Sequence, residues 1–381
     1  MRHVAFYDTT LRDGEQSPGI SFTREARVAI ATALDAMGVS EIEIGFAASG
    51  AQHAADMHYV GTQGLKARLT SLARPIPGDI DAVLAAGLSR VVLFYGASDM
   101  HLEKKFEVTE DEALSSVLKG VTYAKSKGLF TQFSFEDATR TPVERLIRWG
   151  GTLAEAGCDR IGLADTLGVG TPVLMTEMTS RVKKSVSLPV SVHCHDDFGM
   201  AVANSVAAVL GGADMLSTTM NGIGERSGNA ATEVCATALS QLHGYEVDID
   251  LAQIAEVSAL VYRCASLPQP LIRPVAGKNT FRHESGIHVA AILKDPATYE
   301  PYSPHIVGGK RELCLGKTTG RNALRHLLGA EAADAEELDW LLAEIKARSE
   351  GGAPPTLPRI MHLLQDYRAQ RTAAANLGEL V

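Results

Sequence analysis

Residues 189–197 read Pro189-Val190-Ser191-Val192-His193-Cys194-His195-Asp196-Asp197, an apolar run that ends in two histidines and two acids. The β-branched residues at its start predict a strand, and side chains two apart along a strand lie on the same face. His193 and His195 therefore point the same way, with backbones about 6 to 7 Å apart. Two imidazoles aimed at one point suit a divalent metal, although the pair also fits two histidines hydrogen-bonded to neighbours at a strand end.

Short β-rich runs of this kind alternate with longer amphipathic segments. The expected strands lie near 4–8, 41–45, 67–72, 89–94, 129–135, 159–163, 189–193 and 213–219. The expected helices lie near 22–37, 54–64, 78–86, 109–127, 142–156, 171–184, 199–210 and 228–242. Eight βα units over about 240 residues predict an α/β fold, a closed (β/α)8 TIM barrel, in preference to an open doubly wound sheet. No glycine-rich dinucleotide motif follows the first strand, which also disfavours the open sheet.

The repeat stops near residue 250, and the rest of the chain predicts a mostly helical C-terminal appendage. We expect three parts: a catalytic TIM barrel at 1–250, a linker and lid subdomain at 251–325, and a helical subdomain at 326–381. Helical patterns resume at 321–329, 334–348 and 357–376. Such an extension suits a lid or an arm exchanged between subunits, and a purely packing role is the alternative.

The composition of the chain indicates which classes of partner to expect and in which cellular compartment the protein works. The chain has 381 residues and a net charge of -9, with acidic and basic residues interspersed, which argues against nucleic acid or an anionic membrane as the main partner. We find no signal-peptide pattern and no uncharged stretch of membrane-spanning length. The five cysteines are scattered and unpaired in spacing, so we expect a reducing, cytoplasmic location.

Polar residues that follow the strands are the candidates for chemistry, because TIM-barrel active sites lie at the C-terminal face. The first strand leads into Asp13 and the seventh into His193 and His195, which together offer one oxygen and two nitrogens to a single ion. Asn229, beyond the eighth strand, can complete the set through its amide oxygen. This donor set suits zinc, manganese, magnesium or iron, and the sequence does not choose among them.

Arg12 directly precedes the metal-binding carboxylate. A guanidinium there can stabilise an oxyanion that forms on a carbonyl group. It can equally be a structural ion-pair partner of Glu136 or Glu43, and the sequence leaves both interpretations open.

Four motifs carry a resemblance to a known family. They are residues 8–16 (DTTLRDGEQ), 193–201 (HCHDDFGMA), 221–229 (NGIGERSGN) and 285–288 (SGIH). In this order they resemble the motifs of the DRE-TIM metallolyase superfamily. Within it, residues 4 to about 325 are similar to the group of homocitrate, isopropylmalate and citramalate synthases.

The resemblance implies a metal-dependent Claisen-type condensation. The enolate of acetyl-CoA attacks the ketone of a metal-chelated 2-oxo acid, and thioester hydrolysis releases CoA and a 2-hydroxy di- or tricarboxylate. The catalytic residues that the resemblance implies are Arg12, Glu136, His288 and Tyr299. Because the segment that carries His288 reaches a partner's barrel in the family, a homodimer with exchanged C-terminal segments is expected. The alternatives are a carbon-carbon lyase of the hydroxymethylglutaryl-CoA lyase type and a barrel used only as a binding scaffold.

The acceptor is expected to be a 2-oxo acid with a second anionic group. The substrate-binding candidates are Gln16, Arg74, Gln132, Ser134 and Thr166. Gln132 stands where homocitrate synthases carry an arginine, and Pro75 lies near the place of their substrate-binding histidine. Losing a cation at a distal carboxylate weakens recognition by about 1.5 to 3 kcal/mol unless another charge replaces it. We expect Arg74 to be that charge, with oxaloacetate or a phosphonopyruvate-type analogue as the acceptor.

Overall fold

The computed structural model describes residues 2–329 and 333–378, and the chain divides into two compact units, Met1–Gln269 and Pro270–Val381. The first unit is a closed barrel of eight strands. These are β1 (His3–Asp8), β2 (Glu41–Glu43), β3 (Arg68–Ala73), β4 (Arg90–Gly96), β5 (Phe130–Glu136), β6 (Arg160–Asp165), β7 (Val190–Cys194) and β8 (Met215–Thr218). Every neighbouring pair is parallel, and β1 closes the barrel by pairing with both β8 and β2.

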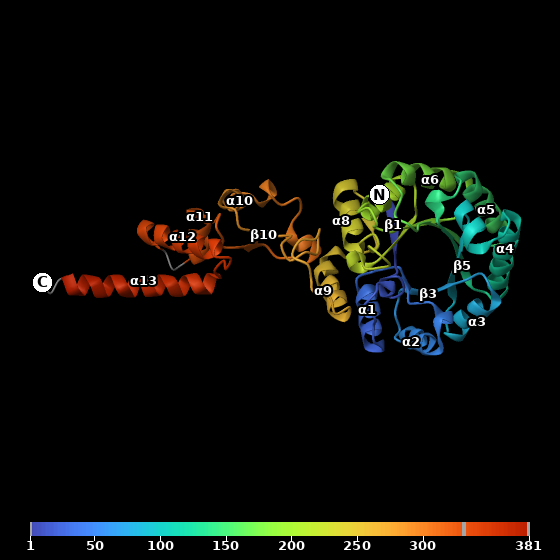
Figure 1. The fold of residues 1–381 in the computed structure, drawn as a ribbon, viewed down its shortest axis with the longest axis horizontal. Helices are drawn as coiled ribbons and strands as arrows, with labels where there is room; N and C mark the ends of the chain where they lie inside the picture. The colour runs from blue at the N-terminus through green and yellow to red at the C-terminus, as the bar shows by residue number, and fades with distance from the viewer. Residues whose placement is uncertain (1, 330–332, 379–381) are drawn as a thin grey trace. The chain divides into compact units, whose positions relative to one another are not determined.

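Each barrel strand is followed by a helix, and the helices surround the strands (Figure 1). They are α1 (Arg24–Ala36), α2 (Ala51–Gly61), α3 (Pro77–Ala85), α4 (Glu110–Ser126), α5 (Val143–Glu155), α6 (Pro172–Ser185), α7 (Ala201–Leu210) and α8 (Thr232–His243). The predicted TIM barrel is therefore confirmed. Capping residues define several helix starts. At the start of α4, for example, the Thr109 hydroxyl accepts a hydrogen bond from the Glu112 amide, and the Glu112 carboxylate accepts one from the Thr109 amide.

Helix α8 begins four residues later than the sequence pattern predicts. The residues before it remain extended, because Asn229 bridges to His195 and Ala231 bridges to Thr219. This extended segment follows β8 along the C-terminal face of the barrel. It brings Asn229 beside the histidines of β7.

The first unit extends past the boundary that we expected at residue 250. A short strand, β9 (Glu246–Val247), pairs with the start of β1, and helix α9 (Ile254–Cys264) follows. The apolar face of α9 is buried, and the Asn221 side chain donates a hydrogen bond to the Ser258 carbonyl at 2.9 Å. These contacts tie α9 to the barrel, so the division between the units falls after Gln269.

The second unit has its own small sheet and core. Strands β10 (Arg282–His283) and β11 (Glu312–Leu313) pair in parallel. The helices are α10 (Gly286–Ile292), α11 (Arg321–Leu328), α12 (Ala335–Glu350) and α13 (Leu357–Gly378). The core of the last three helices includes Leu324, Leu328, Leu338, Leu341, Ile345, Ile360 and Leu364.

The expected boundary at 325/326 falls inside α11, and positions 330–332 and 379–381 of the expected 326–381 subdomain lie outside the described residues. Short one-turn helices complete both units: η1 (Gly14–Gln16), η2 (Ala47–Ser49), η3 (His101–Phe106), η4 (Ala138–Arg140), η5 (Met220–Gly222), η6 (Leu251–Gln253), η7 (Pro296–Thr298) and η8 (Pro304–Val307). Within the described ranges, no helix combines the length and the apolar composition needed to cross a bilayer.

Candidate active site

A cavity of about 330 Å³ opens where the barrel strands end. Nine of the thirteen residues that the sequence singles out line it: Arg12, Asp13, Gln16, Gln132, Ser134, Glu136, Thr166, His193 and His195. A tenth, Asn229, contacts Asp13 directly. The barrel therefore gathers side chains from β5, β6, β7 and the loop after β1 at one place.

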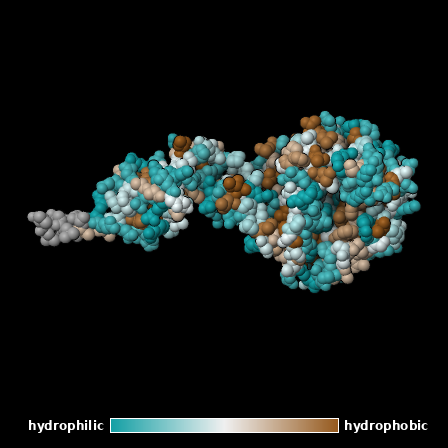
Figure 2. Space-filling model, viewed as in Figure 1, coloured by the Kyte–Doolittle hydropathy of each residue, from teal (hydrophilic) through white to brown (hydrophobic). Residues whose placement is uncertain are grey.

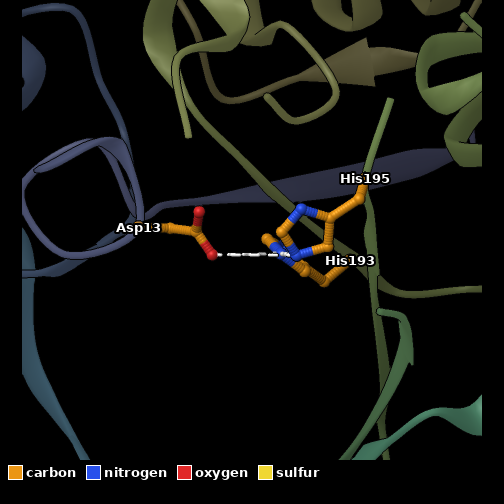
Figure 3. A group of neighbouring side chains, drawn as sticks. All are labelled: Asp13, His193 and His195. Carbon is orange, nitrogen blue, oxygen red and sulfur yellow. Dashed lines mark hydrogen bonds and ion pairs between the residues drawn. The ribbon is translucent and has the colours of Figure 1, made fainter. Parts of the chain in front are cut away.

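Asp13, His193 and His195 form a compact group of ligand atoms (Figure 3). The two Nε2 atoms lie 3.2 Å apart, and they lie 3.5 Å (His193) and 3.9 Å (His195) from Oδ2 of Asp13. One ion placed between these atoms can reach all three at about 2.1 Å, the usual length of a metal bond to nitrogen or oxygen. The predicted convergence of one acid and two imidazoles is present.

The site holds Asp13 and His195 in the protonation states that bind a cation. Burial, with the neighbouring His193, lowers the pKa of His195 to about 3, so the ring is neutral at neutral pH. Burial opposes ionisation of Asp13, but the Arg12 guanidinium and the hydrogen bond with His193 outweigh it and hold the pKa of that carboxyl well below its usual range. Neutral imidazole and ionised carboxylate are the ligand forms of these residues.

Two neighbours orient the group for a cation. His193 contacts the Ser217 hydroxyl through Nδ1 at 3.1 Å, which leaves Nε2 facing the other ligands. The Asn229 amide donates to Oδ1 of Asp13 at 2.9 Å, while its own Oδ1 is buried and accepts no hydrogen bond. A buried acceptor without a donor is unfavourable, and a cation beside Asp13 would satisfy it. The residues present therefore fit a divalent metal.

Arg12 is fixed at the edge of the cavity by acids on two sides. Its Nε donates to Glu43 at 2.6 Å and its Nη1 donates to Asp13 at 2.8 Å and to the Gln16 side chain at 3.3 Å. Burial disfavours the charge, but these carboxylates raise the pKa of Arg12 further above its ordinary value. Of the two ion-pair partners that the sequence suggested for Arg12, the structure shows Glu43. The guanidinium also lines the cavity, so it can contact a ligand there.

Glu136, the last residue of β5, has a partner that sequence reasoning missed. Lys105, on the π-helical turn η3, donates to both carboxylate oxygens of Glu136 at 2.7 Å. His101 of the same turn lies 3.6 Å from Glu136. In the sequence, only the two lysines Lys104 and Lys105 after β4 pointed to a cation in this region. Their position along the chain does not indicate a contact with β5.

Thr166 follows β6 and is oriented by the backbone. The Asp137 amide donates to the Thr166 hydroxyl oxygen at 2.8 Å. Because the oxygen accepts this bond, the hydroxyl hydrogen can be donated to a ligand in the cavity.

Comparison with known proteins identifies the family. The model described as HMGL-like matches residues 3–261, and the model described as homocitrate synthase post-HMGL domain-like matches residues 275–352. The chain belongs to the HMGL-like family. The second match places it with the homocitrate, isopropylmalate and citramalate synthases of that family, as the motifs had indicated.

Curated relatives of this family member include synthases of three kinds. It is 45% identical to the homocitrate synthase AksA of Methanopyrus kandleri, over 97% of this chain and 93% of the relative. It is 43% identical to the (R)-citramalate synthase CimA of Methanocaldococcus jannaschii, over 90% and 70%. It is 41% identical to the 2-isopropylmalate synthase of Sulfolobus acidocaldarius, over 92% of each.

A solved HMG-CoA lyase from Bacillus subtilis has the same fold. It superposes with a TM-score of 0.63 and 22% identity over 70% of this chain and 95% of that chain. At this identity the likeness shows the barrel alone. The lyase alternative is therefore a distant one, and this HMGL-like family member is an acyltransferase of the synthase group.

Arg74 does not line the cavity of this HMGL-like family member. Its guanidinium pairs with both carboxylate oxygens of Asp79 at 2.8 and 2.9 Å, and its side chain is 58% exposed. The structure therefore gives no support to Arg74 as the replacement cation in the acceptor site. Pro75 precedes α3 and packs against Gly120 of α4.

His288 and Tyr299 belong to the second unit. Their rings stack with centroids 4.0 Å apart and an interplanar angle of 29°. Both side chains are exposed in the chain described, and Tyr299 is 45% exposed. The resemblance implies that both residues are catalytic. Their contact is formed within the second unit, between α10 and the residue that follows η7.

Proposed function

We propose that the protein condenses acetyl-CoA with a 2-oxo acid on a divalent metal and hydrolyses the thioester, releasing CoA and a 2-hydroxy di- or tricarboxylate. The observation that carries the proposal is the convergence of Asp13, His193 and His195 at the mouth of a barrel cavity, beside a fixed guanidinium. Membership of the synthase group supports the reaction class.

Asp13, His193 and His195 would hold the metal, and Asn229 could join them through its amide oxygen. When bound, a divalent ion would supply Lewis acidity to the ketone of the 2-oxo acid. Zinc, manganese, magnesium and iron all fit the donor set.

Arg12 and Thr166 would then bind the acceptor. Arg12 is held rigidly by Glu43 and Asp13, so it can stabilise the alkoxide that forms when the ketone is attacked, without reorganising. Thr166 keeps its hydroxyl hydrogen for the acceptor carboxylate, because its oxygen accepts from the Asp137 amide. Gln16, on η1, supports Arg12 from the other side.

We assign removal of the acetyl-CoA methyl proton to His288, with Tyr299 and Glu136 acting beside it, as the family resemblance implies. The stacked His288 and Tyr299 rings support a joint role. Such a proton transfer needs a site shielded from water, yet both side chains are exposed on their own unit. Another surface must therefore cover them during catalysis.

We propose that this surface belongs to a second copy of the chain in a homodimer with exchanged C-terminal segments. Figure 2 shows hydrophobic side chains on the outside of the protein. In the second unit, Ile272 is 90% exposed, Ile287 is 77% exposed and Leu271 is 57% exposed, and Ile287 directly precedes His288. Light scattering coupled to size-exclusion chromatography should give a mass near 81 kDa, twice the 40.5 kDa of one chain; the monomer mass at micromolar concentration would refute the dimer.

We also propose that the enzyme works in the cytoplasm. The five cysteines are free thiols, and Cys158, Cys194 and Cys235 are buried in the barrel unit. Cell fractionation with detection of the native protein would test the location.

The decisive experiment measures CoA release from acetyl-CoA with pyruvate, oxaloacetate, 2-oxoglutarate, 2-oxoisovalerate and phosphonopyruvate in turn. We expect release with at least one acceptor, abolished by chelation and restored by a divalent metal. Asp13→Asn is the matched control, because it keeps the shape of the side chain and removes the ligand charge. No release with any acceptor and any metal would refute the proposed function.

A further inference from the structure

A buried arginine lies beneath the cavity and is not accounted for by the metal chemistry. Arg160, at the start of β6, is 4% exposed and donates to both oxygens of Glu41, at 2.7 and 3.1 Å. Arg90 donates to the same carboxylate at 2.8 Å. Two guanidiniums therefore share one carboxylate, and the group carries an excess positive charge inside the barrel.

Arg160 also contacts Gln132, which lines the cavity. Its Nε donates to the Oε1 atom of the Gln132 amide. A guanidinium has donors only, so the amide oxygen must face Arg160 and the NH2 group must face the other way. Arg160 thus determines which end of an otherwise ambivalent amide is presented to the cavity.

The orientation of the Gln132 amide also affects Ser134, the next residue on the same face of β5. The Gln132 Nε2 atom donates to the Ser134 hydroxyl oxygen at 2.8 Å, so the Ser134 hydrogen is left for a ligand. Gly162 on the neighbouring strand makes room for both side chains. A Cβ atom at Gly162 would lie 2.3 Å from the Ser134 oxygen and 2.8 Å from the Gln132 nitrogen.

Strand register places this chain of bonds below the metal ligands. Gln132 pairs with Arg160 and Ser134 pairs with Gly162, whereas His193 pairs with Ala164. Since parallel strands run from the closed end of the barrel to the active-site face, Arg160, Gln132 and Ser134 lie deeper than the metal ligands. A 2-oxo acid chelated at the mouth would direct its far end toward them.

We propose that Arg160 is a positioning residue that makes the deep end of the cavity a donor-only subsite for an oxyanion group at the far end of the acceptor. The Gln132 NH2 group and the Ser134 hydroxyl supply the donors, and the buried positive charge favours a carboxylate or a phosphonate. A 2-oxo acid with an alkyl group at its far end has no oxygen there to accept these hydrogen bonds. The Gln132 and Ser134 donors would then be buried without partners. This inference rests on the proposed condensation and deepens it.

The sharpest test is Gln132→Glu. Glutamate has nearly the same size and can pair directly with Arg160, so packing is preserved, but the subsite then presents carboxylate oxygens in place of donors. We expect the ratio of kcat/KM for oxaloacetate over pyruvate, which has no distal group, to fall by about tenfold or more. Phosphonopyruvate and 2-oxoglutarate distinguish which oxyanion and which length fit.

Arg160→Met tests the positioning role separately. Without Arg160 the amide can turn over, so we expect KM for the preferred oxyanion acceptor to rise by about tenfold with a smaller change in kcat. Calorimetric binding of the acceptor without acetyl-CoA should weaken in parallel, and Arg160→Lys should recover part of the loss. If Arg160→Met does not fold, Arg160→Lys is compared with wild type instead, and an unchanged KM for the oxyanion acceptor would overturn the positioning role.

Two results would overturn this inference while leaving the condensation intact. One is wild-type enzyme that uses 2-oxoisovalerate as well as any oxyanion-bearing acceptor. The other is an unchanged acceptor ratio in Gln132→Glu. Failure of the condensation itself would be seen differently, as no CoA release from wild-type enzyme with any acceptor.

Discussion

The charge on the candidate metal ligands Asp13 and His195 is set by their immediate neighbours. Burial raises the pKa of Asp13, but Arg12 donates to it at 2.8 Å and His193 lies 3.5 Å away, and together they hold the pKa well below its usual range. Burial likewise keeps His195 neutral. Asp13 and His195 are therefore already in the protonation states that bind a divalent ion at neutral pH.

Replacing His195 with alanine removes one of only three strong ligands. We expect metal affinity to fall by about 100-fold or more and CoA release to fall with it. Metal content by plasma mass spectrometry after dialysis, together with the CoA assay, measures both effects. His243→Ala, at the exposed end of α8, is the control histidine. Full metal content and full activity in His195→Ala would contradict the site.

Arg74→Ala should leave acceptor preference unchanged. The side chain is 58% exposed and forms an ion pair with Asp79, and it does not line the cavity. Removing it therefore changes no contact in the acceptor site. We expect kcat/KM ratios among the 2-oxo acids to stay within about twofold of wild type, the range typical of surface substitutions. A selective loss of the oxyanion-bearing acceptors would restore Arg74 to the acceptor site.

The residues that sequence could place are those whose position follows from local periodicity. His193 and His195 face one point because strand side chains alternate, and Asp13 follows the first strand. Arg160 could not be placed in this way, because its partners Glu41 and Gln132 lie 119 and 28 residues away. Lys105 and Glu136 are likewise joined only by the folded barrel.

At the scale of elements, the end of β1 contains a buried acid that affects stability. Asp8 is fully buried, and burial outweighs the hydrogen bonds from Thr10 and Thr232 to raise its pKa to about 7. The folded protein therefore binds this proton more tightly than the unfolded chain does. The contribution to stability is present below about pH 4 and is lost as the pH rises toward 7.

Asp8→Asn should remove this pH dependence. Between about pH 4 and 7 the titration of Asp8 lowers the free energy of unfolding by up to about 1.4 kcal/mol per pH unit, and asparagine does not titrate. We expect the variant to gain stability relative to wild type as the pH is raised from 5 to 8. Urea unfolding of both proteins at several pH values measures the difference; a difference that stays constant with pH would contradict the assignment.

Elements with a regular period were predictable, and those without one were not. The eight strands and eight helices of the barrel follow the sequence pattern with shifts of at most four residues. Helix α9 was missed because it interrupts the βα alternation, although its buried face has helical spacing. The π-helical turn η3 has no sequence period of its own, and its Phe106 ring stacks on Tyr95 of β4 at 4.0 Å, a contact between residues eleven positions apart.

At the scale of the whole molecule, the residues that we propose as catalytic are divided between two compact units. Asp13 and the histidines belong to Met1–Gln269, and His288 and Tyr299 belong to Pro270–Val381. If His288 is the base, as we propose, a complete site needs one unit of each kind. In an exchanged homodimer, each site would take its metal ligands from one chain and its base from the other.

Mixing two inactive variants tests this arrangement directly. Asp13→Asn keeps His288 but loses the metal ligand, and His288→Ala keeps Asp13 but loses the base, so each homodimer should be nearly inactive. In a heterodimer with exchanged segments, the cavity of the His288→Ala chain would receive His288 from its partner and become complete. Half of randomly assembled dimers are mixed and one of their two sites is complete, so co-expression should restore about a quarter of wild-type activity. If each chain instead supplied its own base, no mixed dimer would contain a complete site and the mixture would stay inactive.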